Sequence, residues 1–111
     1  MLTKKLIAEF VGTCFLVMIV VGSGIMAQNL SSDLIIILLA NTIATGAGLT
    51  ALIWIFITVS GTHFNPAVTL SRAFTDTFTG INYEFILPFI IFQLFGALSA
   101  MFMMKLIQRD N

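Results

Sequence analysis

Charged residues are scarce in this sequence, and their scarcity excludes most soluble folds. Only 9% of the 111 residues are charged, against roughly a quarter in a typical soluble domain. Hydrophobic residues make up 59%. The 5 Lys and Arg are balanced by 5 Asp and Glu, so the chain lacks the basic surface that nucleic-acid binding requires. The composition therefore predicts a membrane protein with the lipid bilayer, and no nucleic acid, as its surroundings.

Cysteine is nearly absent as well. Cys14 is the single cysteine and lies in an apolar run, which excludes an internal disulfide and a metal site built from cysteines. We assign Cys14 to packing and expect no metal and no cofactor. Lys4 and Lys5 precede the first apolar run as in a signal peptide, but this run is too long and no clear small-residue cleavage site follows, so we expect it to remain as a helix.

Long apolar runs dominate what is present. A helix needs about 20 residues to cross about 30 Å of hydrocarbon. Three segments meet that length, at residues 6–27, 34–59 and 85–104. We therefore predict one membrane domain over residues 1–111, with three transmembrane helices.

Small residues recur at helical spacing in two of these spans. A spacing of four residues places them on one face, where they let two membrane helices approach closely. We assign this packing role to Ala40, Ala44 and Gly48 in the second span and to Gly96 and Ala100 in the third.

The segment between the second and third spans is too polar to cross a membrane and too apolar for a solvated loop. Asn65 followed by Pro66 is a strong helix start, because the Asn side chain caps unpaired N–H groups and Pro loses no hydrogen bond there. A helix from Pro66 to about Thr75 would be about 15 Å long, half the hydrocarbon thickness. Residues 60–76 are thus either a re-entrant loop with a half-helix, which implies a transport pathway, or an amphipathic loop at the interface.

The motifs of the chain resemble those of one family. Residues 60–61 (SG) and 63–69 (HFNPAVT) are similar to the first signature loop of the aquaporin/glycerol-facilitator channels. Residues 8–13 (AEFVGT), 46–49 (GAGL) and 93–97 (QLFGA) resemble the openings or cores of the three helices that surround it. The resemblance implies one three-helix repeat of that all-α fold and a passive channel, not an enzyme, for water or small uncharged solutes such as glycerol.

The resemblance also implies which residues line the path: His63, Asn65, Pro66, Ala67 and Val68. Asn65 would offer its side-chain amide to a passing oxygen, and the positive end of the half-helix would oppose cations. In the family's second repeat an arginine commonly follows the Asn-Pro-Ala motif, whereas Val68 stands there in this chain.

Glu9 lies within the first span, where a charged side chain costs about 3 kcal/mol. It therefore needs a partner. The resemblance implies that Glu9 and Gln93 support the re-entrant loop through hydrogen bonds with its backbone. The alternative is a proton-carrying carboxylate, which would make the chain a small proton-coupled exporter.

The chain departs from the family pattern in length. Family members are about twice as long and contain two inverted repeats, each with one Asn-Pro-Ala half-helix. This chain carries one repeat and one motif, so it is a fragment, pairs with a different half, or pairs with itself. We expect an antiparallel homodimer around each pore, with up to four dimers, and keep an inactive or assembly half-repeat as the alternative.

The distribution of Lys and Arg bears on self-pairing. With three spans, Lys4, Lys5 and Arg72 lie on one side of the membrane and Lys105 and Arg109 on the other, a bias of three against two. Lys and Arg in short loops set orientation, so we expect insertion in both orientations for a chain of the plasma or inner cell membrane. For Arg72 we expect pairing with Asp76 or extension to the membrane surface.

Overall fold

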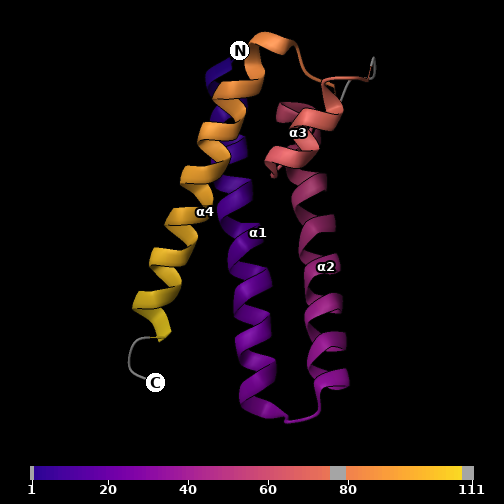
Figure 1. Ribbon diagram of the computed structural model, residues 1–111, viewed down its shortest axis with the longest axis vertical. Coiled ribbons are helices and arrows are strands. Elements are labelled where there is room, and N and C mark those ends of the chain that lie inside the picture. Colours follow the sequence, from indigo (N-terminus) through magenta and orange to yellow (C-terminus); the bar gives the residue numbers. More distant parts are fainter. Residues whose placement is uncertain (1, 76–79, 109–111) are drawn as a thin grey trace.

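The structure, a computed structural model, describes residues 2–75 and 80–108 and contains no strand within them. Three long helices lie side by side, α1 (Leu2–Leu30), α2 (Leu34–Ser60) and α4 (Ile86–Gln108), as Figure 1 shows. The short α3 (Pro66–Arg72) lies near one end, and the 3₁₀ turn η1 (Tyr83–Phe85) leads into α4. The three long helices are apolar and long enough to cross a membrane. The predicted class, an all-α membrane protein, is confirmed.

The long helices extend beyond the apolar runs. The 29 residues of α1 give about 43 Å, which exceeds the hydrocarbon thickness and carries polar residues such as Lys4 and Gln28 into the water on either side. At the start of α2, the Asp33 side chain accepts a hydrogen bond from the Ile35 N–H at 2.9 Å. At its end, Gly61 adopts the left-handed conformation, with φ of 86°, that stops a helix.

Helix α1 occupies the centre and packs against both α2 and α4, whereas the described parts of α2 and α4 do not pack on each other. The α1–α4 contact is close at Gly96, where an added Cβ would lie 2.5 Å from the Phe10 carbonyl oxygen. Ala100, one turn further along, is fully buried. Small residues therefore let these two backbones approach.

Along α2 the small residues differ in their surroundings. An added Cβ at Gly48 would lie 2.6 Å from the Ile19 side chain of α1, so this glycine fits a close contact. Ala44 is half-buried and Ala40 is exposed. Any packing by Ala40 therefore requires a helix other than those described here.

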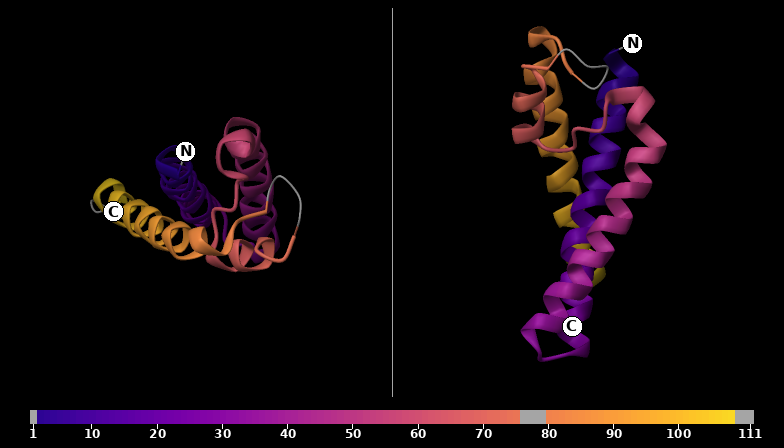
Figure 2. Two further views of the ribbon diagram at one scale, coloured as in Figure 1. Left: turned by 90° about the horizontal axis from the view of Figure 1, so that it is seen from above. Right: turned by 90° about the vertical axis from the view of Figure 1, so that its right-hand side faces the viewer.

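The segment after α2 turns back into the bundle. Helix α2 reaches the upper end at Ser60, the chain then descends between α2 and α4, and α3 returns to the same end, where α4 begins (Figure 2). Helix α3 packs on α4. It has 7 residues, about 10 Å, and is shorter than the expected helix to Thr75 because the chain tightens into a turn at Ala73 and Phe74. The segment is re-entrant rather than lying along the surface.

Candidate functional site

The loop that joins α2 to α3 has an unusual backbone. Gly61, Thr62 and Phe64 all have positive φ, at 86°, 54° and 55°. Glycine tolerates this conformation, but a residue with a side chain as bulky as Phe64 adopts it only when its surroundings compensate the strain. The loop therefore depends on contacts from the helices around it.

Glu9 of α1 provides the main contacts. Its Oε1 accepts hydrogen bonds from the Phe64 N–H at 2.8 Å and from Gln93 Nε2 at 2.8 Å. Its Oε2 accepts from the Ser60 hydroxyl at 2.6 Å and the His63 N–H at 3.2 Å. The side chain is fully buried, and no cationic side chain bonds it in the described part of the chain. Four donors, two of them from the loop backbone, thus stabilise the carboxylate in place of a counter-ion.

Gln93 of α4 joins this carboxylate to α3. Its Nε2 donates to Glu9 and also to the Thr69 hydroxyl at 2.8 Å, while its Oε1 is buried and has no partner among the described residues. Because an amide nitrogen cannot accept, the Thr69 hydroxyl hydrogen is available to donate to His63 Nδ1, which lies 3.0 Å away. Gln93 therefore supports the loop through side chains, whereas the expectation was a direct bond to the backbone.

His63 lies inside the bundle. Its side chain is buried between α3 and α4, with the ring 5.2 Å from that of Phe89. The structure thus separates the His63 imidazole from the exposed surface at Asn65. A role in lining the path stays a prediction for His63.

Phe64 anchors the loop from its other side. Its ring lies against Gly12 of α1, where an added Cβ would be 2.0 Å from a ring carbon, and it meets the Phe56 ring edge-on at a centroid distance of 6.1 Å. Only a glycine leaves room for the ring at this position. Phe64 is therefore held at its backbone by Glu9 and at its side chain by Gly12.

At the tip of the re-entrant segment, Asn65 begins α3. Its Oδ1 accepts a hydrogen bond from the Ala67 N–H at 2.7 Å, and no described residue bonds its Nδ2. Asn65 and Ala67 are exposed, and Pro66 and Val68 are half-buried. The structure thus places Asn65 and Ala67 at the surface of the single chain, and a role of these four residues in lining the path stays a prediction.

Arg72, at the outer end of α3, donates to the Gly61 carbonyl oxygen at 2.9 Å. This bond ties the two ends of the re-entrant segment together. The expected partner Asp76 lies outside the described residues, as does Arg109.

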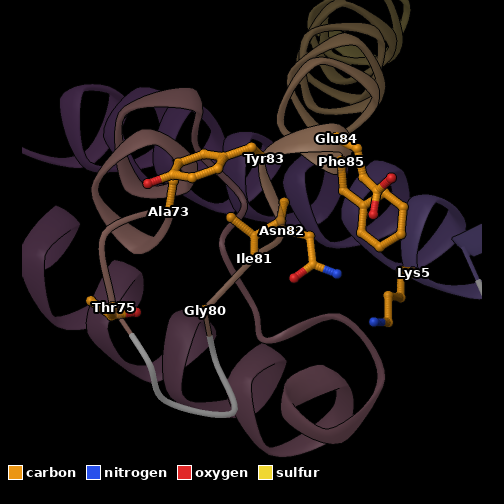
Figure 3. Close-up of a pocket in the computed structure, with 9 residues that line it drawn as sticks. All are labelled: Lys5, Ala73, Thr75, Gly80, Ile81, Asn82, Tyr83, Glu84 and Phe85. Carbon is orange, nitrogen blue, oxygen red and sulfur yellow. The ribbon is translucent and has the colours of Figure 1, made fainter.

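A cavity of about 680 Å³ opens at the upper end of the molecule, apart from Asn65. Figure 3 shows it between the chain after α3 and the start of α4, and its lining residues include Lys5 and Asn82. The Lys5 ammonium lies 5.9 Å from the centre of the Phe85 ring. None of the predicted path residues lines this cavity.

Sequence reasoning missed several residues of the loop network, namely Gly12, Ser60, Phe64 and Thr69 as contact partners. Ser60 and Thr69 carry a weak signal, because each is a polar residue within or beside an apolar segment. No local pattern points to the pairing of Gly12 with Phe64, which lie 52 positions apart in the sequence.

A membrane-spanning helical bundle with a re-entrant half-helix that starts at an Asn-Pro pair defines the class. The family comparison agrees, because the sequence pattern of the Major intrinsic protein family matches residues 1–111. The chain belongs to this family, which confirms the resemblance of its motifs.

Particular relatives can be named. The chain is 46% identical over 98 residues to the aquaglyceroporin AqpS of Rhizobium meliloti. The aligned region covers 88% of this chain and 41% of the relative. It is 40% identical over 103 residues to aquaporin C of Dictyostelium discoideum, an alignment that covers 93% of this chain and 36% of the relative. Aquaporin AqpM of Methanothermobacter thermautotrophicus is 36% identical to the chain over 116 aligned positions, which cover 91% of this chain and 46% of the relative. No solved structure matches. The chain spans about two-fifths of the length of the curated relatives it matches.

Proposed function

We propose that this chain forms a passive channel for water and small uncharged solutes such as glycerol, with each pore made by two antiparallel copies. The observation that carries the proposal is the exposed start of α3 at Asn65, held inside a membrane bundle by Glu9. Irregular backbone at membrane depth is tolerated where it is covered by protein or lines a water-filled cavity. The names of the relatives, aquaglyceroporin and aquaporin, support the same solute class.

The chemistry follows from the two ends of the Asn65 side chain. Its carbonyl oxygen caps α3, which leaves the two N–H groups of Nδ2 available to a passing oxygen. A neutral molecule with an acceptor oxygen can replace its bonds to water there. The Asn65 amide would select a solute by hydrogen bonding alone, without any covalent step. We therefore propose a passive channel.

A second copy would complete the enclosure. One chain supplies one half-helix, and the surface of Asn65 and Ala67 is open in the single chain. In an antiparallel pair the two half-helices enter from opposite sides and meet near the midplane. The exposed side of α2, including Ala40, would then be available to other copies, in agreement with the small-residue spacing.

The position of Glu9 favours a channel over a proton-coupled exporter. A carboxylate that carries protons must be reached by water or substrate, but Glu9 is fully buried and accepts from four donors. Its protonation would remove an acceptor from the loop. We therefore assign Glu9 and Gln93 to loop support.

The test is flux through the purified chain alone. We expect liposomes that contain it to swell or shrink faster than empty liposomes in stopped-flow light scattering, after an osmotic step with sucrose for water and with glycerol for solute. A proton gradient should not change the rates. Absence of any flux from correctly inserted protein would reject the homodimer pore, and flux that requires a proton gradient would favour the exporter.

A further inference from the structure

A second asparagine amide lies inside the membrane-spanning part of the bundle, far from the loop. Asn41 of α2 accepts a hydrogen bond through Oδ1 from the Ser23 hydroxyl of α1 at 2.8 Å and a longer one from the Thr45 hydroxyl at 3.4 Å. An asparagine side chain can take part in four hydrogen bonds, two as acceptor and two as donor. Both bonds found here use the oxygen, and no described residue accepts from Nδ2.

The depth of Asn41 makes these unused donors significant. Asn41 lies seven residues beyond Leu34, about 10 Å along α2, whose 27 residues span about 40 Å. With α2 centred in the bilayer, the amide lies about 5 Å inside the hydrocarbon. The side chain is only partly buried. Amide donors exposed to lipid at that depth are costly, so they require a water-filled space or another partner.

The amide also lies toward the side on which the loop enters. Ser23, which bonds Asn41, follows Glu9 by fourteen residues, almost four helical turns, and therefore shares its face of α1. Glu9 holds the loop on that face. Gly24 beside Ser23 has no side chain, and its added Cβ would meet only Asn41 Nδ2, at 3.8 Å. Gly24 therefore leaves space beside the Asn41 amide, next to the face of α1 that holds the loop.

We propose that the Asn41 amide is a second hydrogen-bond donor on the permeation path, binding the oxygen of water or of a small neutral hydroxyl-bearing solute. This inference rests on the proposed function. In an antiparallel pair, Asn41 lies in the half of the membrane that its own loop does not enter and that the loop of the second copy does. A solute would meet one Asn41 amide before the central pair of Asn65 amides and another after it.

The chemistry repeats that of Asn65. In both residues a bond inside the protein holds the carbonyl oxygen, at Ala67 N–H for Asn65 and at Ser23 for Asn41, and no described residue accepts a hydrogen bond from the nitrogen. Such an amide keeps both N–H groups available to donate, which favours neutral solutes with an acceptor oxygen over cations. Ser23 and Thr45 act as positioning residues for this amide.

The test compares Asn41→Leu, which keeps the size and removes the amide, with Thr42→Val as the matched control. The Thr42 hydroxyl already donates to the Leu38 carbonyl oxygen at 2.8 Å, and the residue is exposed on another side of α2. We expect glycerol flux through Asn41→Leu liposomes to fall about threefold to tenfold, as loss of one neutral hydrogen bond would give. Flux through Thr42→Val should stay within about twofold of wild type.

A second measurement separates a path residue from a contact between copies. In a Cys14→Ser background, Asn41→Cys and Thr42→Cys are treated with a charged, water-soluble thiol reagent. We expect rapid labelling of Asn41→Cys with loss of glycerol flux, and slow labelling of Thr42→Cys.

Each possible outcome either supports or overturns the role of Asn41. If wild-type liposomes pass neither water nor glycerol, the proposed function fails and this inference fails with it. If the wild type conducts and Asn41→Leu conducts equally well, only the inference is overturned. If Asn41→Leu fails to assemble, labelling decides: labelling of Asn41→Cys that blocks flux supports the proposal, and protection from the reagent assigns the amide to a contact between copies.

Discussion

Asn65 uses the two ends of its side-chain amide for different tasks. The oxygen accepts from the Ala67 N–H at 2.7 Å and starts α3, and no described residue accepts from the nitrogen of this exposed residue. A capping role and a solute-binding role therefore do not compete. Substitutions that keep the oxygen but change the other end separate the two tasks.

We expect Asn65→Asp to impair flux more than Asn65→Ser. Both residues keep a capping oxygen and lose the amide donors, which alone should lower flux about threefold to tenfold. Asp also brings two carboxylates together where the copies meet, and like charges at close range are costly in low dielectric. Stopped-flow rates per inserted chain measure the effect. Equal rates for the two variants would contradict the meeting of two copies at this residue.

Val68 lies half-buried on α3, directly after the Asn-Pro-Ala motif. A homodimer has valine at both equivalent positions, so we expect a wide, weakly polar constriction that admits glycerol as well as water and excludes protons less strictly than one with an arginine. Val68→Arg would place two mutually repelling cations in the pore. Glycerol flux should fall about tenfold, equivalent to a barrier about 1.4 kcal/mol higher, and water flux should fall less.

Two results would contradict this filter. One is a wild-type protein that passes water but excludes glycerol. The other is a correctly assembled Val68→Arg variant in which both fluxes are unchanged.

At the scale of elements, the loop between α2 and α3 is held by helices that lie far from it in sequence. Its backbone has three positive φ angles, and two of them belong to residues other than glycine. Neither propensity nor α3 itself compensates that strain. Three residues of the long helices do so. Glu9 of α1 accepts hydrogen bonds from the loop backbone, Gly12 of α1 leaves room for the Phe64 ring, and Gln93 of α4 donates to Glu9.

We expect Gly12→Ala to destabilise the protein by about 1–3 kcal/mol, as overpacking of a filled site does. The new Cβ would lie 2.0 Å from the Phe64 ring, which has to move and pull the loop with it. Gly46→Ala on α2 is the matched control, because its added Cβ meets nothing within 4 Å. Thermal unfolding in detergent, followed by circular dichroism, measures both. A Gly12→Ala protein as stable as the control would argue against this role of Phe64.

Glu9→Gln should also destabilise the loop. All four bonds to Glu9 are donated to its oxygens, so replacing one oxygen by NH₂ leaves two donors facing a donor. We expect a cost of about 2–5 kcal/mol, with flux lost in proportion to assembly. Glu84→Gln, an exposed carboxylate at the membrane end, serves as the control. An assembled Glu9→Gln protein that has lost only proton-dependent transport would support the exporter instead.

At the scale of the whole molecule, orientation decides whether two copies can form a pore. The start of α1 and the end of α4 lie at opposite ends of the bundle in Figure 1, so three spans place Lys5 and Arg72 opposite Lys105. With so small a bias in Lys and Arg, we expect both orientations in the membrane. Reporters fused to the C-terminus that are active on one side only would measure the two fractions.

Added charge extends this test. Three lysines added at one end should fix one orientation and abolish flux, and co-expression with an oppositely biased version should restore it. If nearly all wild-type molecules share one orientation, the antiparallel homodimer is wrong.

The sequence by itself determined the class, the three apolar helices, the helix start at Asn65 and Pro66, and the family. These depend on composition, on the length of apolar runs and on local backbone chemistry, all of which act between near neighbours. It also indicated that Glu9 needs a partner, because a carboxylate in a membrane span cannot stay unpaired.

Only the tertiary structure decided which groups meet. It placed four donors around Glu9, turned the His63 ring inward against Phe89, and brought Phe64 over Gly12. It also set the Asn41 oxygen against the Ser23 hydroxyl, while no described residue accepts from the amide nitrogen. These contacts join residues from separate helices, and their geometry depends on how closely α1, α2 and α4 approach. Helix crossing is set by packing over the whole bundle, which no local pattern in the sequence encodes.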